Sequence, residues 1–282
     1  MADEKSSGKK MRSKRPDFST IGGLVIALAG ILGGLILEKG KVSDLTQVTA
    51  AMIVLGGTLG SVMVTNSLGT VLGAFKSVIH VFFEEVIDPS AGIDEIIAYA
   101  TKARKNSIIS LEEDLNKITD PFLQKALSLA VDGTDLNEIR SMMELEMTQS
   151  EKHQEAIAKV YEAAGGYSPT IGIIGAVMGL IQVMKNLENI DEVGHGIATA
   201  FVATIYGVAV ANLFFLPAAN KLKNHMHHDM QAKELLLEGV ASIVEGLNPK
   251  LIRIKLEAFV QSSAKAKAPS GGKAAVAAQA AG

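Results

Sequence analysis

Cysteine is absent from the 282-residue chain, so disulfide bonds, thiolate zinc sites and cysteine nucleophiles are excluded. Tryptophan is also absent, so any aromatic belt at a membrane surface has to consist of tyrosine and phenylalanine. Charged residues make up 20% of the chain, and the net charge of −3 gives no basic surface for nucleic acid. No glycine-rich phosphate loop follows a strand, and no His–carboxylate motif occurs. We therefore expect neither covalent catalysis nor a cofactor.

Hydrophobic residues are abundant at 48%, and they are concentrated in four blocks. A soluble chain of this size rarely combines so much apolar sequence with so little charge. The blocks contain no Asp, Glu, Lys or Arg, and helices of about 18–22 residues span a bilayer core of roughly 30 Å. The sequence predicts four membrane-spanning helices, at residues 21–37, 48–68, 169–184 and 197–217.

The first block follows a basic segment, which is also the pattern of a signal peptide. The block is long and no A-x-A cleavage site follows it, so a membrane helix is the better interpretation. Gly30 and Gly34 in the first block, like Gly56 and Gly60 in the second, have the small-x-x-x-small spacing that lets another helix approach closely.

The region between the second and third blocks has a helical pattern. Pro121 is typical of a helix start, Gly133 of a break, and Asp135 of the N-cap of a long helix that we expect to end at Gly165–Gly166. Further amphipathic helices are expected at residues 234–247 and 251–260. The last 21 residues are rich in Ala, Gly, Lys and Ser, a composition typical of disorder.

Lysine and arginine set the predicted topology, because cytoplasmic loops carry an excess of both. These residues lie mainly in the N-terminal segment, near residues 76–105 and after Pro217. Both termini and the large loop are therefore predicted to be cytoplasmic. The expected plan is a basic cytoplasmic N-terminus (1–18), spans one and two (19–68), a helical cytoplasmic domain (69–166), a hairpin of spans three and four (167–218), cytoplasmic helices (219–261) and an Ala-rich tail (262–282).

The predicted hairpin carries polar side chains at membrane depth, although none of them ionises near neutral pH. They are Thr170, Gln182, Thr199, Thr204, Tyr206 and Asn212. A single hydroxyl in a membrane helix commonly bonds the carbonyl four residues earlier, but a group of six favours an interior face or a polar partner helix. Since a proton path needs an ionisable group, the acceptor would have to come from another chain. A scaffold that moves no ion is the alternative.

Two prolines and a group of charges are further candidates. Pro169 and Pro217 are either ordinary helix-end residues or hinges at the cytoplasmic mouth of the hairpin. Arg104 and Glu112 lie in a densely charged stretch that is either a solvated helix surface or an electrostatic docking site. The histidines at 225, 227 and 228 are expected at the lipid–water boundary rather than on a metal.

The order of these elements resembles the MotA family of flagellar stator subunits, within the MotA/TolQ/ExbB superfamily. The resemblance covers about residues 19–258 and rests on the segments ARKNSIISLEEDL, YSPTIGIIGAVMGL and FVATIYGVAVANLFFLP. It implies an all-α, four-span inner-membrane protein with a large helical cytoplasmic loop. It also implies a homopentamer around two copies of a MotB partner, whose single membrane helix carries the proton-accepting Asp.

The resemblance also assigns roles to residues. Pro169 and Pro217 match the functional prolines of the family, and Thr204 matches a threonine near the ion path, where Tyr206 is a further candidate. Arg104 and Glu112 match the charges that engage the rotor protein FliG. At Ala176, sodium-driven relatives of the PomA type carry Thr, so alanine favours protons.

The predicted function is therefore conversion of proton flow into torque on a flagellar rotor. An ExbB- or TolQ-type energiser of envelope or transport machinery is the alternative. Those proteins usually have three spans, so the block at residues 21–37 and the Arg104/Glu112 pair distinguish the two.

Overall fold

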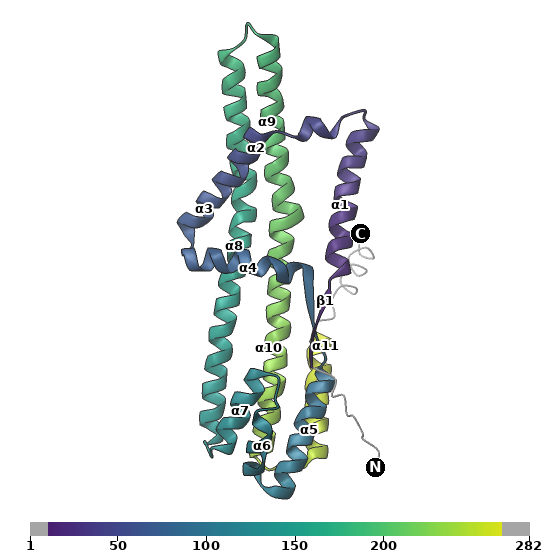
Figure 1. Cartoon of the computed structure of the whole chain (residues 1–282), viewed down its shortest axis with the longest axis vertical. Helices are drawn as coiled ribbons and strands as arrows, with labels where there is room; N and C mark the ends of the chain where they lie inside the picture. The colour runs from purple at the N-terminus through teal and green to yellow at the C-terminus, as the bar shows by residue number, and fades with distance from the viewer. Residues whose placement is uncertain (1–10, 267–282) are drawn as a thin grey trace, which may run out of the picture. The chain divides into compact units, whose positions relative to one another are not determined.

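A computed structural model describes residues 11–266 of the chain (Figure 1). The first ten residues of the predicted basic segment, and the predicted tail beyond residue 266, lie outside the described range. In chain order the elements are β1 (Arg12–Pro16), α1 (Phe18–Leu37), a 3₁₀ turn (Val42–Leu45), α2 (Val48–Ala51), a π-helical turn (Met52–Gly56), α3 (Gly57–Thr65), α4 (Leu68–Phe82), β2 (Phe83–Ile87), α5 (Pro89–Asn106), a 3₁₀ turn (Ile108–Leu111), α6 (Glu112–Leu115), α7 (Pro121–Val131), α8 (Leu136–Lys185), α9 (Ile190–Val210), a second π-helical turn (Ala211–Phe215), α10 (Leu216–Val244) and α11 (Pro249–Ala266).

Four helical segments are long and apolar enough to cross a membrane: Phe18–Leu37, Val48–Thr65, Leu136–Lys185 and Ile190–Val244. The prediction of an all-α protein with four spans and a large helical loop is confirmed. The second span ends earlier than expected, because Asn66 is extended and α4 begins anew at Leu68 after the N-cap Ser67. At the other end, α11 continues to Ala266, so residues 262–266 are helical rather than part of an irregular tail.

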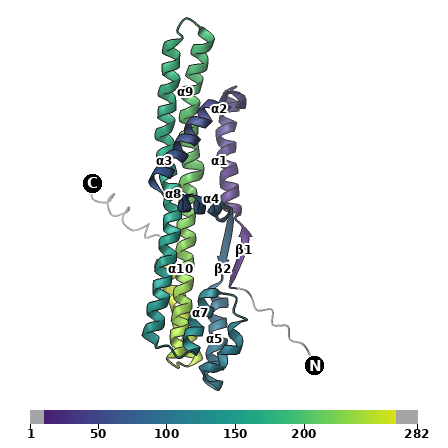
Figure 2. The ribbon, with the colours of Figure 1, turned by 60° about the vertical axis from the view of Figure 1, so that its left-hand side comes forward.

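One feature was not predicted, a two-stranded sheet of β1 and β2 (Figure 2). The backbone N–H of Asp88 donates to Met11 and that of Asp17 donates to Phe82, so the strands run antiparallel. Both strands are short, and about seventy residues separate them in the sequence. A local hydrophobic pattern cannot reveal such a pairing.

The chain divides into two compact units. Within the described range, the first consists of residues 11–13, 87–149 and 227–266, and the second of residues 14–86 and 150–226. Within its described part, the first unit has one hydrophobic core between α5, α7, the start of α8, the end of α10 and α11. Its large, fully buried side chains include Ile96, Leu123, Leu127, Ile139, Leu235 and Leu256.

Local capping signals position the helices of this unit as predicted. Asp120 caps α7 by accepting hydrogen bonds from the N–H groups of Phe122 and Leu123. Gly133, at φ +78°, ends α7 in the left-handed conformation that glycine adopts without strain. Asp135 accepts from the N–H of Asn137 at the start of α8, as an N-cap does. The predictions at Pro121, Gly133 and Asp135 are thus confirmed.

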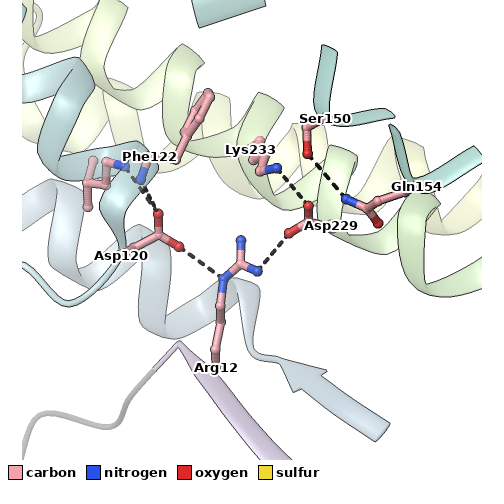
Figure 3. A network of polar contacts seen from close by, with 8 residues as sticks. Arg12, Asp120, Phe122, Ser150, Gln154, Asp229 and Lys233 are labelled. Atoms are coloured by element: carbon pink, nitrogen blue, oxygen red, sulfur yellow. Dashed lines mark hydrogen bonds and ion pairs between the residues drawn. The ribbon is translucent and has the colours of Figure 1, made fainter. Parts of the chain in front are cut away.

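Ion pairs fasten the N-terminal strand to this unit. Figure 3 shows Arg12 between two carboxylates, with its Nε 3.0 Å from Asp120 and its Nη1 2.7 Å from Asp229. Asp229 also pairs with Lys233 at 2.8 Å. Since Asp120 is the α7 cap, one guanidinium connects β1 with the start of α7 and with α10.

The second unit contains the predicted hairpin, and three predicted boundaries there are wrong. Helix α8 does not end at Gly165–Gly166 but continues through Pro169 to Lys185. The turn is only residues 186–189, not 185–196, because Asn189 caps α9. After Val210 the chain does not leave the helix at Pro217 but passes through a π-helical turn into α10.

Packing explains why the glycine pair does not end α8. A Cβ at Gly165 would lie 2.5 Å from the side chain of Leu216, so glycine permits close approach there instead of a turn. Contacts with a neighbouring helix of this kind override the weak local preference of glycine against helix.

Candidate functional site

Helices α8 and α9 form the predicted hairpin, and small residues hold them together. A Cβ at Gly172 would lie 2.9 Å from the carbonyl oxygen of Ala203, and one at Gly179 would lie 2.7 Å from that of Gly196. At Gly207 a Cβ would lie 2.5 Å from the oxygen of Ser168. These distances are shorter than ordinary contacts, so the two backbones touch. Small side chains permit such contact between membrane helices.

Ser168 adds a polar contact at the same crossing. Its side chain is fully buried, and its hydroxyl donates to the carbonyl oxygen of Gly207 at 2.7 Å. Neither Ser168 nor the glycines of the hairpin were predicted as site residues. The spacing of Gly172, Gly175 and Gly179 could have revealed them, since it places all three on one helix face.

By contrast, the glycines that the sequence singled out have no close neighbour among residues 11–266. A Cβ at Gly30, Gly34, Gly56 or Gly60 would meet nothing within 4 Å. Packing of another helix against these positions stays a prediction.

Three of the predicted polar side chains bond only their own helix. The Thr170 hydroxyl donates to Tyr167 at 2.8 Å, that of Thr204 donates to Ala200 at 3.2 Å, and the Asn212 amide donates to Val208 at 2.9 Å. This is the ordinary way for a polar side chain to be satisfied in a membrane helix. Gln182 is exposed. A part for Thr204 in an ion path stays a prediction.

Tyr206 and Thr199 instead connect α9 with the segment before α2. The Tyr206 hydroxyl donates to the carbonyl of Leu45 and accepts from the N–H of Gln47 at 3.4 Å. The Thr199 hydroxyl lies 2.6 Å from Oε1 of Gln47 and 2.9 Å from the carbonyl of His195. In this structure both side chains position the second span against the hairpin.

The prolines interrupt two neighbouring helices. Pro169 is inside α8, where it cannot donate to the carbonyl of Gly165. Pro217 is the second residue of α10, directly after the π-helical turn. Ala176 and Thr204 are both half-buried. Thr204 on α9 lies beside Gly172 of α8, and Gly172 precedes Ala176 by one helical turn.

The outer faces of these helices are apolar and uncovered. On α8 the exposed apolar side chains include Ile173, Ile174, Val177, Met178, Leu180, Ile181 and Met184. None of the residues of α1 is buried. Surfaces of this kind suit contact with lipid or with further membrane helices.

The charged stretch of the first unit separates into paired and unpaired groups. Lys102 lies 2.6 Å from Asp114, which also pairs with Lys117 at 2.8 Å. These two lysines lower the pKa of the Asp114 carboxyl through their hydrogen bonds. Arg104 and Glu112 are exposed, and within residues 11–266 neither has an ion pair.

Arg104 and Glu112, both unpaired among the described residues, lie on either side of a sharp turn in the chain. Arg104 is in the last turn of α5 and Glu112 begins α6. Between them, Ser107 has a φ of +75°, a backbone conformation that is uncommon for a residue other than glycine. The chain therefore reverses between the two charges and leaves both accessible to a partner.

Comparisons with known proteins agree with this architecture. Residues 114–235 match the MotA/TolQ/ExbB proton channel family, and residues 21–105 match the Motility protein A N-terminal family. Motility protein A of Bacillus subtilis (strain 168) is 33% identical over 265 residues, which cover 92% of this chain and 96% of that protein. Motility protein A of Helicobacter pylori (strain ATCC 700392 / 26695) is 34% identical over 86% of this chain and 95% of its own length.

Solved structures agree as well. A structure of C. jejuni MotAB matches with a TM-score of 0.81 and 32% identity, over 86% of this chain and 95% of that one. The flagellar MotAB stator complex from Bacillus subtilis matches with a TM-score of 0.79 and 30% identity, over 89% of this chain and 100% of that one. The four spans and the helical loop define a multi-span membrane subunit of the proton channel class. The chain belongs to the Motility protein A family of flagellar stator subunits.

Proposed function

We propose that this chain is the membrane subunit of a proton-driven flagellar stator and requires a second protein to conduct. The observation that carries the proposal is the absence of any side chain that ionises near neutral pH from residues 169–184 and 197–217 of the hairpin. A proton needs an acceptor at membrane depth. The hairpin offers hydroxyls and backbone, so the acceptor carboxylate comes from a partner.

The partner that fits is a MotB-type protein with one membrane helix and an Asp within it. The matched solved structures are MotAB complexes, which supports such a partner here. We propose five copies of this chain around two copies of the partner, in the inner membrane, with both termini cytoplasmic. The uncovered apolar faces of α1 and α8 are the surfaces that such an assembly would use.

Proton flux in liposomes tests the partner requirement. Liposomes with the purified chain alone should conduct at the background rate. Liposomes with the chain and a one-span, Asp-bearing partner should conduct, and an Asp-to-Asn partner is the matched control. Flux from the chain alone would refute the proposal, because the acceptor would then be in this chain.

We further propose that Arg104 and Glu112 dock the rotor protein FliG. Their exposure and the absence of ion pairs among the described residues support this role, since no bond within the described chain has to break on docking. The double reversal Arg104→Glu, Glu112→Lys should impair motility, while membrane insertion and partner binding stay intact. Exposed charges change stability by less than about 0.5 kcal/mol, so misfolding should not confound the result.

The control reverses another exposed charge of the first unit, outside the proposed pair, Lys250→Glu, which should leave motility unchanged. Full motility of the double reversal with an unaltered rotor would show that the two charges only face solvent.

A further inference from the structure

A pocket opens beside Arg104 in the first unit. It has a volume of about 360 Å³, which is more than one aliphatic side chain occupies. Three helix ends form its walls: the last turn of α5, the end of α7 and the end of α10. It is partly open to solvent, and its lining includes Ala100, Ala103, Ile108 and Val244.

Small residues create this pocket. Ala100, Ala103 and Ala130 contribute only methyl groups, and Gly133 and Gly246 contribute no side chain. Both glycines have positive φ values, +78° and +72°, and a Cβ at either would meet nothing within 4 Å. The two helix ends therefore leave open space where side chains would otherwise cover the core.

Arg104 is the one charged side chain among the residues that line the pocket. Among the described residues its guanidinium has no ion pair, so it is available for a carboxylate from outside. The walls are mostly apolar but include the polar residue Thr134. Mostly apolar walls next to one unpaired cation are complementary to an aliphatic side chain that has a carboxylate one helical turn away.

We propose that this pocket is the apolar anchor of the rotor-docking surface and accepts one aliphatic side chain, such as leucine or isoleucine, from an acidic helix of the rotor protein. The inference rests on the docking role proposed above for Arg104 and Glu112. In this arrangement the charges orient the partner, and the buried side chain supplies most of the affinity.

Filling the pocket tests the proposal without changing any charge. Ala103→Leu and Thr134→Leu enter it from different walls. Ala98→Leu is the matched control, because Ala98 is exposed on the same helix as Ala103 and does not line the pocket. Each full-length variant is expressed from a titratable promoter in cells that lack the native subunit. The expression level for half-maximal swimming is then measured, with membrane amount and co-isolation of partner and sister copies as controls.

Exclusion of one buried aliphatic side chain lowers affinity by about tenfold or more. We therefore expect both pocket variants to need about tenfold more protein for half-maximal swimming, with normal co-isolation, while Ala98→Leu behaves as wild type.

Other outcomes overturn the proposal in distinguishable ways. If both pocket variants swim as wild type while the Arg104/Glu112 reversal is impaired, the docking surface stands and the pocket is not part of it. If that reversal also swims normally, the proposed docking function itself fails. Loss of co-isolated sister copies from both pocket variants would show that the pocket serves contact between copies. An equal defect in Ala98→Leu would exclude a pocket-specific effect.

Discussion

Replacement of Gly207 by alanine is the sharpest test of the hairpin. The new methyl group would lie 2.5 Å from the carbonyl oxygen of Ser168, whereas ordinary contacts begin at 3.4 Å. Backbone atoms of Gly172 and Pro169 lie 3.1 and 3.2 Å from the same position. No flexible side chain can move aside, so α8 and α9 have to separate by about 0.9 Å at this point.

This separation has a cost that can be estimated. Separation by this amount lengthens the 2.7 Å bond from Ser168 to Gly207 beyond hydrogen-bonding distance, a loss of about 0.5–1.5 kcal/mol. The loss of close backbone packing adds to it, while the better helix propensity of alanine returns about 1 kcal/mol. Overpacking of a well-packed site typically costs about 1–3 kcal/mol in total, and we expect Gly207→Ala to fall in this range.

Thermal unfolding of the detergent-solubilised protein, followed by circular dichroism, measures the effect. Gly194→Ala is the matched control, because it is on the same helix and its Cβ would meet nothing within 4 Å. Gly207→Ala should melt several degrees below wild type, while Gly194→Ala should melt at or slightly above it. Equal melting temperatures for Gly207→Ala and wild type would refute the close packing of α8 and α9.

Three further predictions concern other parts of the molecule. The folded-state pKa of Asp114 is lowered, so its contribution to stability should be present above the ordinary carboxyl pKa of about 4 and be lost as the pH falls through the lower folded value. The melting temperature of Asp114→Asn should therefore lie below that of wild type near pH 7 and converge with it in strong acid. A difference in melting temperature that stays constant with pH would contradict this. Tyr206→Phe removes the hydroxyl that bonds Leu45, so it should lower unfolding free energy by about 0.5–1.5 kcal/mol, and an unchanged denaturant midpoint would contradict the bond. Ala176 offers no hydroxyl as a sodium ligand. The speed of tethered-cell rotation should therefore be unchanged when potassium replaces sodium at fixed membrane potential and pH. Rotation that collapses without sodium would show that sodium is the driving ion.

The sequence was sufficient for features that depend on local chemistry. Four apolar blocks predicted four spans, and Pro121, Gly133 and Asp135 marked helix ends where the structure has them. Each of these helix ends depends on a few neighbouring residues, such as a capping side chain or a glycine with a positive φ. The prediction of a helix end at Gly165–Gly166 was wrong because glycine also permits close helix packing. Only the position of Leu216 in the fold shows that glycine serves packing rather than a helix end here.

The candidate site was less accessible from sequence. Arg104, Glu112 and Asp114 belong to one densely charged stretch, and their order alone does not show which of them are paired. The fold distinguishes them, because Lys102 and Asp114 pair with each other while Arg104 and Glu112 remain unpaired among the described residues. The pocket beside Arg104 was equally hidden, since its walls come from three helices distant in sequence.

The packing around Gly165 places the helix interruptions at Pro169 and Pro217 next to each other. Pro169 leaves the Gly165 carbonyl without its usual donor in α8. Gly165 in turn lies against Leu216, the residue before Pro217 and next to the π-helical turn. The interrupted stretches of the two helices are therefore adjacent, while above them the backbones of α8 and α9 touch over several turns. Adjacent interruptions in two helices are positions at which both helices can bend together, so a shared hinge role for Pro169 and Pro217 stays a prediction.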